Sequence, residues 1–281
     1  MIVIGKGPFG SSIAKRLRQD LEDLIHLGSR EFLDPTFACS VLELEPERPI
    51  VTVLKDDDAS ERVWSKVFAS PYFSQGTVCI ESSTLTPSRI LIWSEEVLGR
   101  GGIPVECPLT GSVPGALAGS LNFFYSHTGD VAPQGFTTFQ NIMHKDAFRF
   151  TEFGEASAYK LLYNSTNFLV LLALSSFVQS LGELSFSKDQ IRDLLLRDKS
   201  WLTAVAVSKL ERLLTRDFSN PDFHIKTMLK DISYRMDSSL PSTVLDDLVL
   251  SRLLEARPDS VTLSSDFSTI LSVLASEVHL D

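Results

Sequence analysis

Three glycines near the start of the chain have the spacing of a phosphate-binding turn. They follow the apolar run of residues 2–4 in a G-x-G-x-x-G pattern and precede a segment with helical periodicity. The first glycine permits a tight turn, the second lets a pyrophosphate approach the backbone, and the third allows close packing of helix on strand. The helix that follows directs backbone amides at the phosphates. The predicted dinucleotide contacts here are Gly5, Lys6, Gly7, Pro8, Phe9 and Gly10.

The segment about 20 residues further on distinguishes between the two nicotinamide dinucleotides. An acidic residue there binds the ribose hydroxyls of NAD, whereas Ser29 and Arg30 offer a hydroxyl and a guanidinium suited to the 2′-phosphate of NADP. Glu31 stands against this interpretation because its carboxylate suits ribose hydroxyls, and a solvated loop arginine is a further alternative. We expect NADP, with NAD less favoured.

A second polar segment could bind an acid group. Thr110, Gly111 and Ser112 form a short stretch of hydroxyl and amide donors that can hold a carboxylate. An ordinary turn is the alternative, because all three residue types favour turns.

Strand-like and helix-like stretches alternate over the first half of the chain. Helical spacing predicts helices at residues 11–24, 59–68 and 87–98. Short apolar runs predict strands at residues 2–4, 24–27, 49–54, 77–81 and, as the last one, 105–107. This alternation is typical of a parallel sheet covered by helices.

The second half contains only helical patterns. Helices are predicted at residues 155–181, 188–196, 201–215, 223–236 and 242–256, separated by glycine and proline. We therefore expect a nucleotide-binding domain at residues 1–150 and an all-helical substrate and dimerisation domain at residues 151–281.

Composition narrows the classes of function. The net charge is −10, which disfavours nucleic acid as a partner. Cys39, Cys79 and Cys107 form no zinc pattern, the five histidines are scattered, and no metal site is expected. The start of the chain has no signal-peptide features, and the most apolar run, residues 168–174, is too short to span a bilayer. A cytoplasmic protein without a membrane partner is the expectation.

Several further segments match known motifs. Residues 81–87 resemble D-x-S-T-x-x-P, with Glu81 in place of Asp. Residues 107–121 resemble A-P-V-S-G-G-x-x-G-A-x-x-G-x-L, with Thr110 for Ser and Ser112 for Gly. Residues 154–164 resemble G-x-G-x-x-x-K-x-x-N-N.

Phe223 with Lys230-Asp231 reproduces F-x6-K-D, and Asp266-Phe267-Ser268 reproduces a C-terminal D-x-S element. By their order and spacing, these motifs and the glycine turn resemble the β-hydroxyacid dehydrogenases, which include 3-hydroxyisobutyrate dehydrogenase and are similar to 6-phosphogluconate dehydrogenase. The resemblance covers nearly the whole chain. It implies an α/β Rossmann-type N-terminal domain followed by an all-α C-terminal domain, and a homodimer. The stretch between Arg30 and Pro49 is shorter than the family has, so a helix and strand are expected to be trimmed.

The resemblance also implies roles for individual residues. Lys160 matches the catalytic lysine, and Asn164 matches the asparagine one helical turn later. The implied cofactor contacts are Leu54, Ser83, Thr84 and Lys230, and the implied substrate contacts are Thr110, Gly111, Ser112 and Phe223.

Lys160 suits this chemistry. Hydride transfer belongs to the cofactor, and the protein must move one proton. A lysine can do so where burial and neighbours lower its pKa towards neutrality, and Lys160 lies in an apolar helical segment. A solvated surface lysine is the alternative.

The sequence thus predicts an NADP-dependent oxidoreductase that interconverts a small hydroxy acid or alcohol and its aldehyde or keto form, with Lys160 as general acid and base. Its partner is a small substrate that carries a carboxylate. Two alternatives are an imine reductase, which usually lacks the lysine, and a non-catalytic nucleotide-binding or interaction module.

Overall fold

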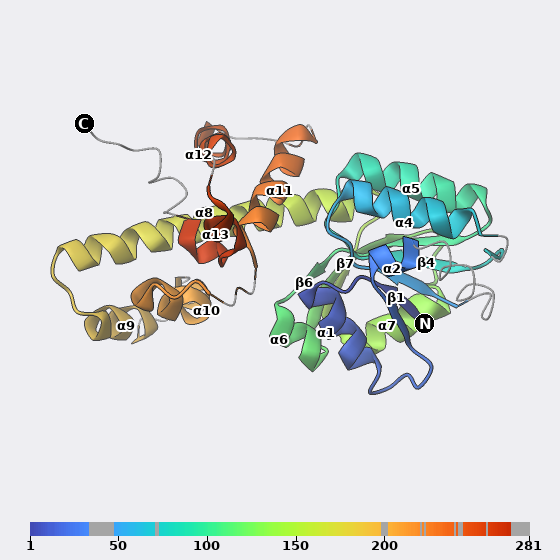
Figure 1. The fold of residues 1–281 in the computed structure, drawn as a ribbon, viewed down its shortest axis with the longest axis horizontal. Coiled ribbons are helices and arrows are strands. Elements are labelled where there is room, and N and C mark those ends of the chain that lie inside the picture. Colours follow the sequence, from blue (N-terminus) through green and yellow to red (C-terminus); the bar gives the residue numbers. More distant parts are fainter. Residues whose placement is uncertain are drawn as a thin grey trace. The chain divides into compact units, whose positions relative to one another are not determined.

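The computed structural model describes residues 1–33, 48–70, 73–197, 202–219, 221, 223–238, 240, 244–256 and 258–270. The chain forms two compact units, Met1–Lys160 and Leu161–Asp281, which we call unit 1 and unit 2 (Figure 1). The two units divide inside one long helix.

The functional domain boundary near residue 150 stays a prediction. The expected trimming between Arg30 and Pro49 falls mostly on residues 34–47, which lie outside the described residues, as does Cys39.

An eight-stranded sheet organises unit 1, in the order β2-β1-β3-β4-β5-β7-β6 with β8 paired to β7. Strands β1 to β5 are parallel, and β7 runs antiparallel to both β5 and β6. Because parallel strands end at the same edge, the segments after β1, β3, β4 and β5 meet there. The strands are β1 (Ile2–Ile4), β2 (Ile25–Leu27), β3 (Ile50–Thr52), β4 (Val78–Glu81), β5 (Ile103–Glu106), β6 (Leu109–Thr110), β7 (Leu121–His127) and β8 (His144–Arg149).

Helices cover both faces of this sheet, as Figure 1 shows. Neighbouring strand residues point to opposite faces, so Val3 contributes to one core and Ile2 to another. Burial on both faces explains the continuous apolar runs in the parallel strands. On the side of Val3 lie α1 (Pro8–Leu17), α6 (Val113–Ala118) and α7 (Gln134–Met143); on the side of Ile2 lie α2 (Ser29–Leu33), α4 (Asp57–Phe68) and α5 (Pro87–Gly99).

Two details of the prediction for unit 1 are wrong. Strands continue beyond residue 107, because β6, β7 and β8 follow; every residue of β8 is exposed, so this strand has no apolar alternation to reveal it. The first helix spans residues 8–17 rather than 11–24, because Pro8 fits the first turn of a helix and the polar residues 18–20 form a turn. The other predicted strands and helices are present with shifted ends.

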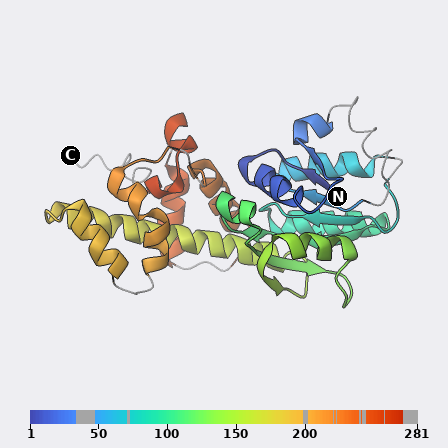
Figure 2. The same cartoon turned by 90° about the horizontal axis from the view of Figure 1, so that it is seen from below.

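Apart from an isolated bridge between His224 and Asp266, the described part of unit 2 is helical. Figures 1 and 2 both show α9 and α10 beside the C-terminal half of the long helix α8. Apolar side chains of α8 to α12 form one core. The helices are α8 (Glu155–Glu183), which starts in unit 1, α9 (Lys188–Arg197), α10 (Leu202–Thr215), α11 (Ile225–Asp237), α12 (Val244–Glu255), α13 (Ser260–Ser264) and the 3-10 helix η1 (Phe267–Thr269). The predicted fold class is confirmed.

Helix α8 is 29 residues long and is apolar enough, with a mean hydropathy of 1.5 in its most apolar window, to cross a membrane by length and composition alone. The prediction from residues 168–174 was too narrow, because the apolar helix extends well beyond that run. Phe168, Leu171 and Leu174 are nevertheless buried in the core of unit 2. The core helix of a globular unit has the same length and apolar composition as a membrane span. The hydropathy of α8 is therefore weak evidence for a membrane span.

Candidate functional site

The glycine turn has the backbone that its sequence predicts. Gly5 has a φ of +146°, and a Cβ at this position would come within 2.2 Å of the Val53 carbonyl oxygen. A Cβ on Gly10 would lie 2.4 Å from the Gly5 carbonyl oxygen, whereas one on Gly7 would meet no atom within 4 Å. Gly5 and Gly10 are therefore required for packing, and Gly7 leaves the approach to the turn open.

The start of α1 fits a bound anion. Its N-cap is Gly7, which has no side chain to cap the helix, Pro8 occupies the first turn, and that turn contains no acidic residue. The first amides of a helix lack acceptors within the helix and carry a partial positive charge. These residues fit the pyrophosphate of a dinucleotide.

At the end of β2, Glu31 is tied to the glycine turn. Its carboxylate lies 2.5 Å from the Lys6 ammonium and accepts a hydrogen bond from the Gly28 amide at 3.2 Å. The hydrogen bond from Lys6, followed by that from Gly28, holds the pKa of the Glu31 carboxyl below its usual value. Ser29 is half-buried and Arg30 is exposed, both at the start of α2. The arrangement leaves both a ribose contact by Glu31 and a phosphate contact by Arg30 open.

The ends of β3 and β4 bring two predicted cofactor residues together. The Leu54 amide donates to the Ser83 hydroxyl at 2.7 Å, and the Ser83 amide donates to Glu81 Oε1 at 3.0 Å. Glu81 is fully buried and also accepts hydrogen bonds from Ser60 Oγ and Trp64 Nε1 of α4. Thr84 follows in the same loop. Glu81 thus fixes the loop that contains Ser83.

Lys160 and Thr110 meet in unit 1. The Lys160 ammonium donates to the Thr110 hydroxyl at 2.7 Å, and the lysine is only 7% exposed. The interpretation of Lys160 as a solvated surface residue is therefore wrong. Gly111 has a φ of +148°, and a Cβ there would come within 2.5 Å of Leu121 Cδ2. Ser112 is exposed at the N-cap of α6.

In unit 2, Asn164 and Lys230 share one carboxylate. The Asn164 amide donates to Asp231 Oδ2 at 2.8 Å, and the Lys230 ammonium lies 2.8 Å from Asp231 Oδ1. Asp231 is 1% exposed. No role was predicted for Asp231, although its place next to Lys230 in F-x6-K-D was a signal that could have found it.

Phe223 has the contacts of a core side chain. Its ring centroid lies 5.9 Å from that of Phe168 and 5.5 Å from that of Phe267. Its assignment to substrate binding stays a prediction, as do the assigned roles of the other site residues.

The structure describes two of the three cysteines. Cys79 and Cys107 are buried thiols, and burial raises the pKa of each. Among the described residues, no three metal-ligating side chains form a group that could hold an ion.

A family model matches half of the chain. Residues 6–147 match the NAD binding domain of 6-phosphogluconate dehydrogenase. The match covers Gly7 and Gly10 of the glycine turn, the Ser83 loop and Thr110, and it ends before Lys160. We found no significant sequence match among curated proteins.

Solved structures share the fold along nearly all of the chain. A 3-hydroxyisobutyrate dehydrogenase of Mycobacterium tuberculosis with L-serine is 18% identical, with a TM-score of 0.76, and the match covers 98% of this chain and 97% of that one. Psf3 in complex with NADP+ and 2-OPP is 20% identical, with a TM-score of 0.77 and coverage of 97% and 99%. A reductive aminase of Aspergillus terreus with NADPH and ethyl levulinate is 15% identical, with a TM-score of 0.57 and coverage of 96% and 97%.

Proposed function

The chain belongs to the β-hydroxyacid dehydrogenase family of NAD(P)-dependent oxidoreductases, and from this premise we propose that it interconverts a small hydroxy acid or alcohol and its aldehyde or keto form. The observation that supports this proposal most directly is the contact between the buried Lys160 ammonium and the Thr110 hydroxyl, at 2.7 Å.

The nicotinamide cofactor, when bound, supplies or accepts the hydride. Lys160 gives a proton to the carbonyl oxygen in reduction and removes one from the hydroxyl in oxidation. Thr110 accepts a hydrogen bond from the amine and so fixes its direction. The hydroxyls and amides of residues 110–112 hold the carboxylate of the substrate.

Asn164 and Lys230 have a supporting role in this proposal. Asp231 accepts from the Asn164 amide and pairs with Lys230, so one buried carboxylate orients both side chains. Asn164 then positions the substrate, and Lys230 interacts with the cofactor.

NADP is the cofactor we propose. Ser29 and Arg30 contact the 2′-phosphate, because a hydroxyl and an exposed guanidinium suit an anionic group. Psf3 is described with NADP+ and the reductive aminase with NADPH, which agrees with this choice. NADPH should quench tryptophan fluorescence at lower concentration than NADH, and the opposite order would assign the ribose to Glu31.

Substitution of Lys160 by Ala tests the function. Turnover of NADPH with short semialdehydes and keto acids should fall by about 10²–10⁴-fold, as expected for loss of a general acid. The Kd for NADPH should stay within about twofold of the wild-type value, since we place Lys160 at the substrate. The matched control is Lys188→Ala, because Lys188 is an exposed lysine at the start of α9.

Other results would redirect the proposal. Undiminished turnover by the Lys160→Ala protein would remove Lys160 from its role. Turnover of cyclic imines in place of carbonyl compounds would favour an imine reductase, which the likeness to the reductive aminase makes worth including. NADPH binding without any turnover would favour the non-catalytic module.

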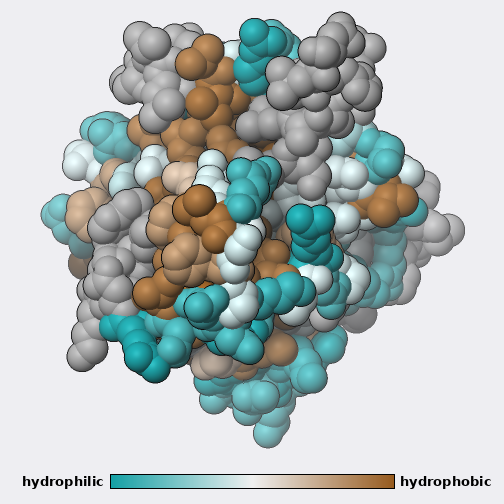
Figure 3. Space-filling view, turned by 90° about the vertical axis from the view of Figure 1, so that its left-hand side faces the viewer, coloured by the Kyte–Doolittle hydropathy of each residue, from teal (hydrophilic) through white to brown (hydrophobic). Residues whose placement is uncertain are grey.

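We also propose a homodimer located in the cytoplasm. Unit 2 exposes large apolar side chains, and Figure 3 shows one face of the molecule on which apolar residues gather. Large exposed apolar patches mark interaction surfaces. Light scattering after gel filtration should give twice the mass of one chain; a monomer at micromolar concentration would contradict the dimer. The exposed side chains are Phe177, Leu184, Phe186, Leu194, Leu196, Val207, Leu248, Leu254 and Val261.

A further inference from the structure

Glu106 is a buried carboxyl group to which the chemistry described above gives no part. It ends β5, is 0% exposed, and is the register partner of Glu81 on β4. Its carboxylate accepts three hydrogen bonds, from Ser126 Oγ at 2.9 Å, from the Gly154 amide at 2.8 Å and from the Ser157 amide at 2.7 Å.

Two of these donors belong to the start of α8. Amides in the first turn of a helix have no acceptor within the helix, and a Ser, Thr, Asp or Asn side chain at the N-cap usually supplies one. Here the residue before the helix is Gly154, which has a φ of +90° and no side chain. The carboxylate of Glu106 takes over this capping function from a different strand. The first turn of α8 is thereby fixed to the end of the sheet.

Lys160 depends on this turn for its position. It lies three residues after Ser157, so the two are neighbours on one side of the helix. Its hydroxyl partner, Thr110, lies four residues after Glu106 along the chain. Glu106 therefore contacts the helix turn that precedes the amine, and it lies on the same short stretch of chain as the hydroxyl.

Packing alone does not account for Glu106. Burial raises the pKa of this carboxyl, while the hydrogen bonds from its donors act in the opposite direction. A buried ionisable group costs free energy that an apolar side chain would avoid. Retaining it is consistent with the need to hold two specific amides.

We propose that Glu106 is a positioning residue that sets the Lys160 amine against Thr110 by capping the first turn of α8. This inference rests on the proposed function of Lys160. It concerns the geometry of the amine and leaves the binding of the cofactor to other residues.

Glu106→Gln tests the proposal, because a glutamine has only one side-chain acceptor atom for the two amides. Amide hydrogen exchange over residues 154–160 should be at least about tenfold faster in the variant, since the capping bonds are weakened. The kcat should fall at least about tenfold, while the Kd for NADPH stays within about twofold of the wild-type value. Unchanged exchange and unchanged kcat would overturn the proposal.

Glu155→Gln is the matched control. Glu155 is an exposed glutamate at the start of the same helix, and its carboxylate accepts from the Thr151 and Glu152 amides. Its kcat should stay within about twofold of wild type, because Glu155 is exposed and accepts from neither the Gly154 nor the Ser157 amide. An equal loss in both variants would show a general effect of charge at this helix end and contradict the specific role of Glu106.

Glu106→Asp keeps the carboxylate and shortens it by one methylene. Its kcat should lie between those of the Gln variant and the wild type; equal kcat values in the Asp and Gln variants would overturn the role of the carboxylate. If the Gln variant does not fold, Glu106→Asp takes over the test, with a several-fold lower kcat supporting the proposal and an unaltered kcat refuting it. Absence of turnover by the wild type would refute the proposed function instead, and the exchange measurement would still decide the role of Glu106.

Discussion

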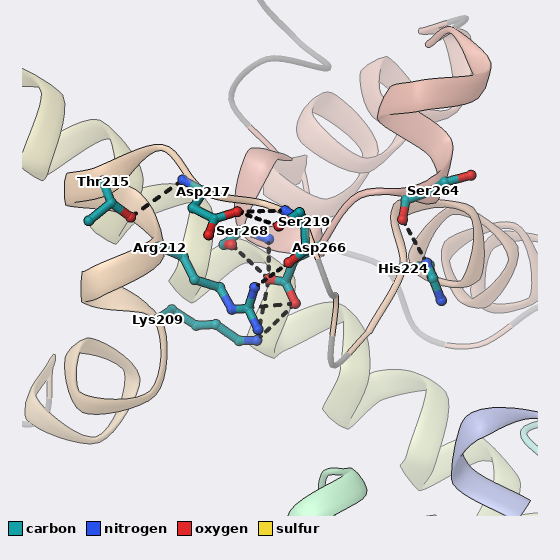
Figure 4. A network of polar contacts seen from close by, with 9 residues as sticks. All are labelled: Lys209, Arg212, Thr215, Asp217, Ser219, His224, Ser264, Asp266 and Ser268. Atoms are coloured by element: carbon teal, nitrogen blue, oxygen red, sulfur yellow. Dashed lines mark hydrogen bonds and ion pairs between the residues drawn. The ribbon is translucent and has the colours of Figure 1, made fainter.

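The two units bury carboxylates in different ways. In unit 1, Glu81 and Glu106 are surrounded by hydroxyl, indole and backbone amide donors. In unit 2, Asp266 lies 3.2 Å from the Lys209 ammonium and also accepts from Ser268 Oγ at 2.6 Å, as Figure 4 shows. The neutral donors around Glu81 and Glu106 fix a loop and the start of a helix. The Lys209 cation, by its ion pair with Asp266, joins α10 to η1.

The local backbone explains this difference. The edge where parallel strands end offers backbone amides in loops and at helix starts, and a carboxylate can satisfy them. Lys209 lies within α10, where the helix already uses its backbone amides, so the link to Asp266 is made by a side-chain cation. The Lys209 ammonium also lies 4.8 Å from the centre of the Phe267 ring. Glu81 and Glu106 of unit 1 thus fix a loop and the start of a helix, whereas the ion pair of Lys209 and Asp266 in unit 2 joins α10 to η1.

The largest effect should come from Lys209→Met. It leaves the Asp266 carboxylate buried with its main cation removed, which costs about 3–5 kcal/mol of stability. Urea unfolding measures the loss of stability, and amide hydrogen exchange shows whether the loss occurs in unit 2. The double variant Lys209→Met and Asp266→Leu should recover part of it, because an apolar pair replaces a buried ion pair while Ser268 loses its acceptor. A double variant as unstable as the single one would show that packing, not charge, is lost.

A smaller effect is expected from Glu81→Gln in unit 1. Its donors are neutral, and glutamine keeps one acceptor, so the loss should be about 1–3 kcal/mol. The fluorescence of the protein should change as well, because Trp64 Nε1 donates to this carboxylate at 2.9 Å. A loss as large as that of Lys209→Met would erase the distinction between the two kinds of buried carboxylate.

The sequence was sufficient for the parts of the fold that depend on local patterns. The glycine turn, the parallel strands and the long helix α8 follow from apolar periodicity and turn residues. The sequence predicted Lys160 as the catalytic residue and Thr110 as a substrate contact, but it did not predict the 2.7 Å hydrogen bond between them.

Contacts between distant segments could not be predicted in this way. Glu106 meets the amides of Gly154 and Ser157 about 50 residues later, and Lys209 meets Asp266 across 57 residues. Such pairs have no periodicity in the sequence. The strand β8 was missed for a related reason. It pairs with β7, but all its residues are exposed, so its sequence has no alternation of apolar and polar residues that would predict a strand.

The smallest effect concerns pH, where the two kinds of carboxylate should differ in sign. Burial alone would raise the pKa of the Asp266 carboxyl, but the Ser268 hydrogen bond and the charge of Lys209 outweigh it and hold the pKa below its usual 3.8. The stability that Asp266 contributes is therefore complete above pH 3.8 and is lost as the pH falls through the folded-state pKa. Burial raises the pKa of Glu106 above 4.5, so its contribution is complete below pH 4.5 and is lost as the pH rises through the folded-state pKa.

Urea midpoints of the wild type, Asp266→Asn and Glu106→Gln between pH 3 and pH 7 test this difference. The gap between the wild type and Asp266→Asn should narrow as the pH falls below about 4, because the variant has no carboxylate to lose there. The gap between the wild type and Glu106→Gln should instead widen on acidification towards pH 4.5, since the protonated glutamate is the form that burial favours. If both gaps change in the same direction with pH, the neutral donors around Glu106 act like the cation beside Asp266, and the contrast between the units concerns geometry alone.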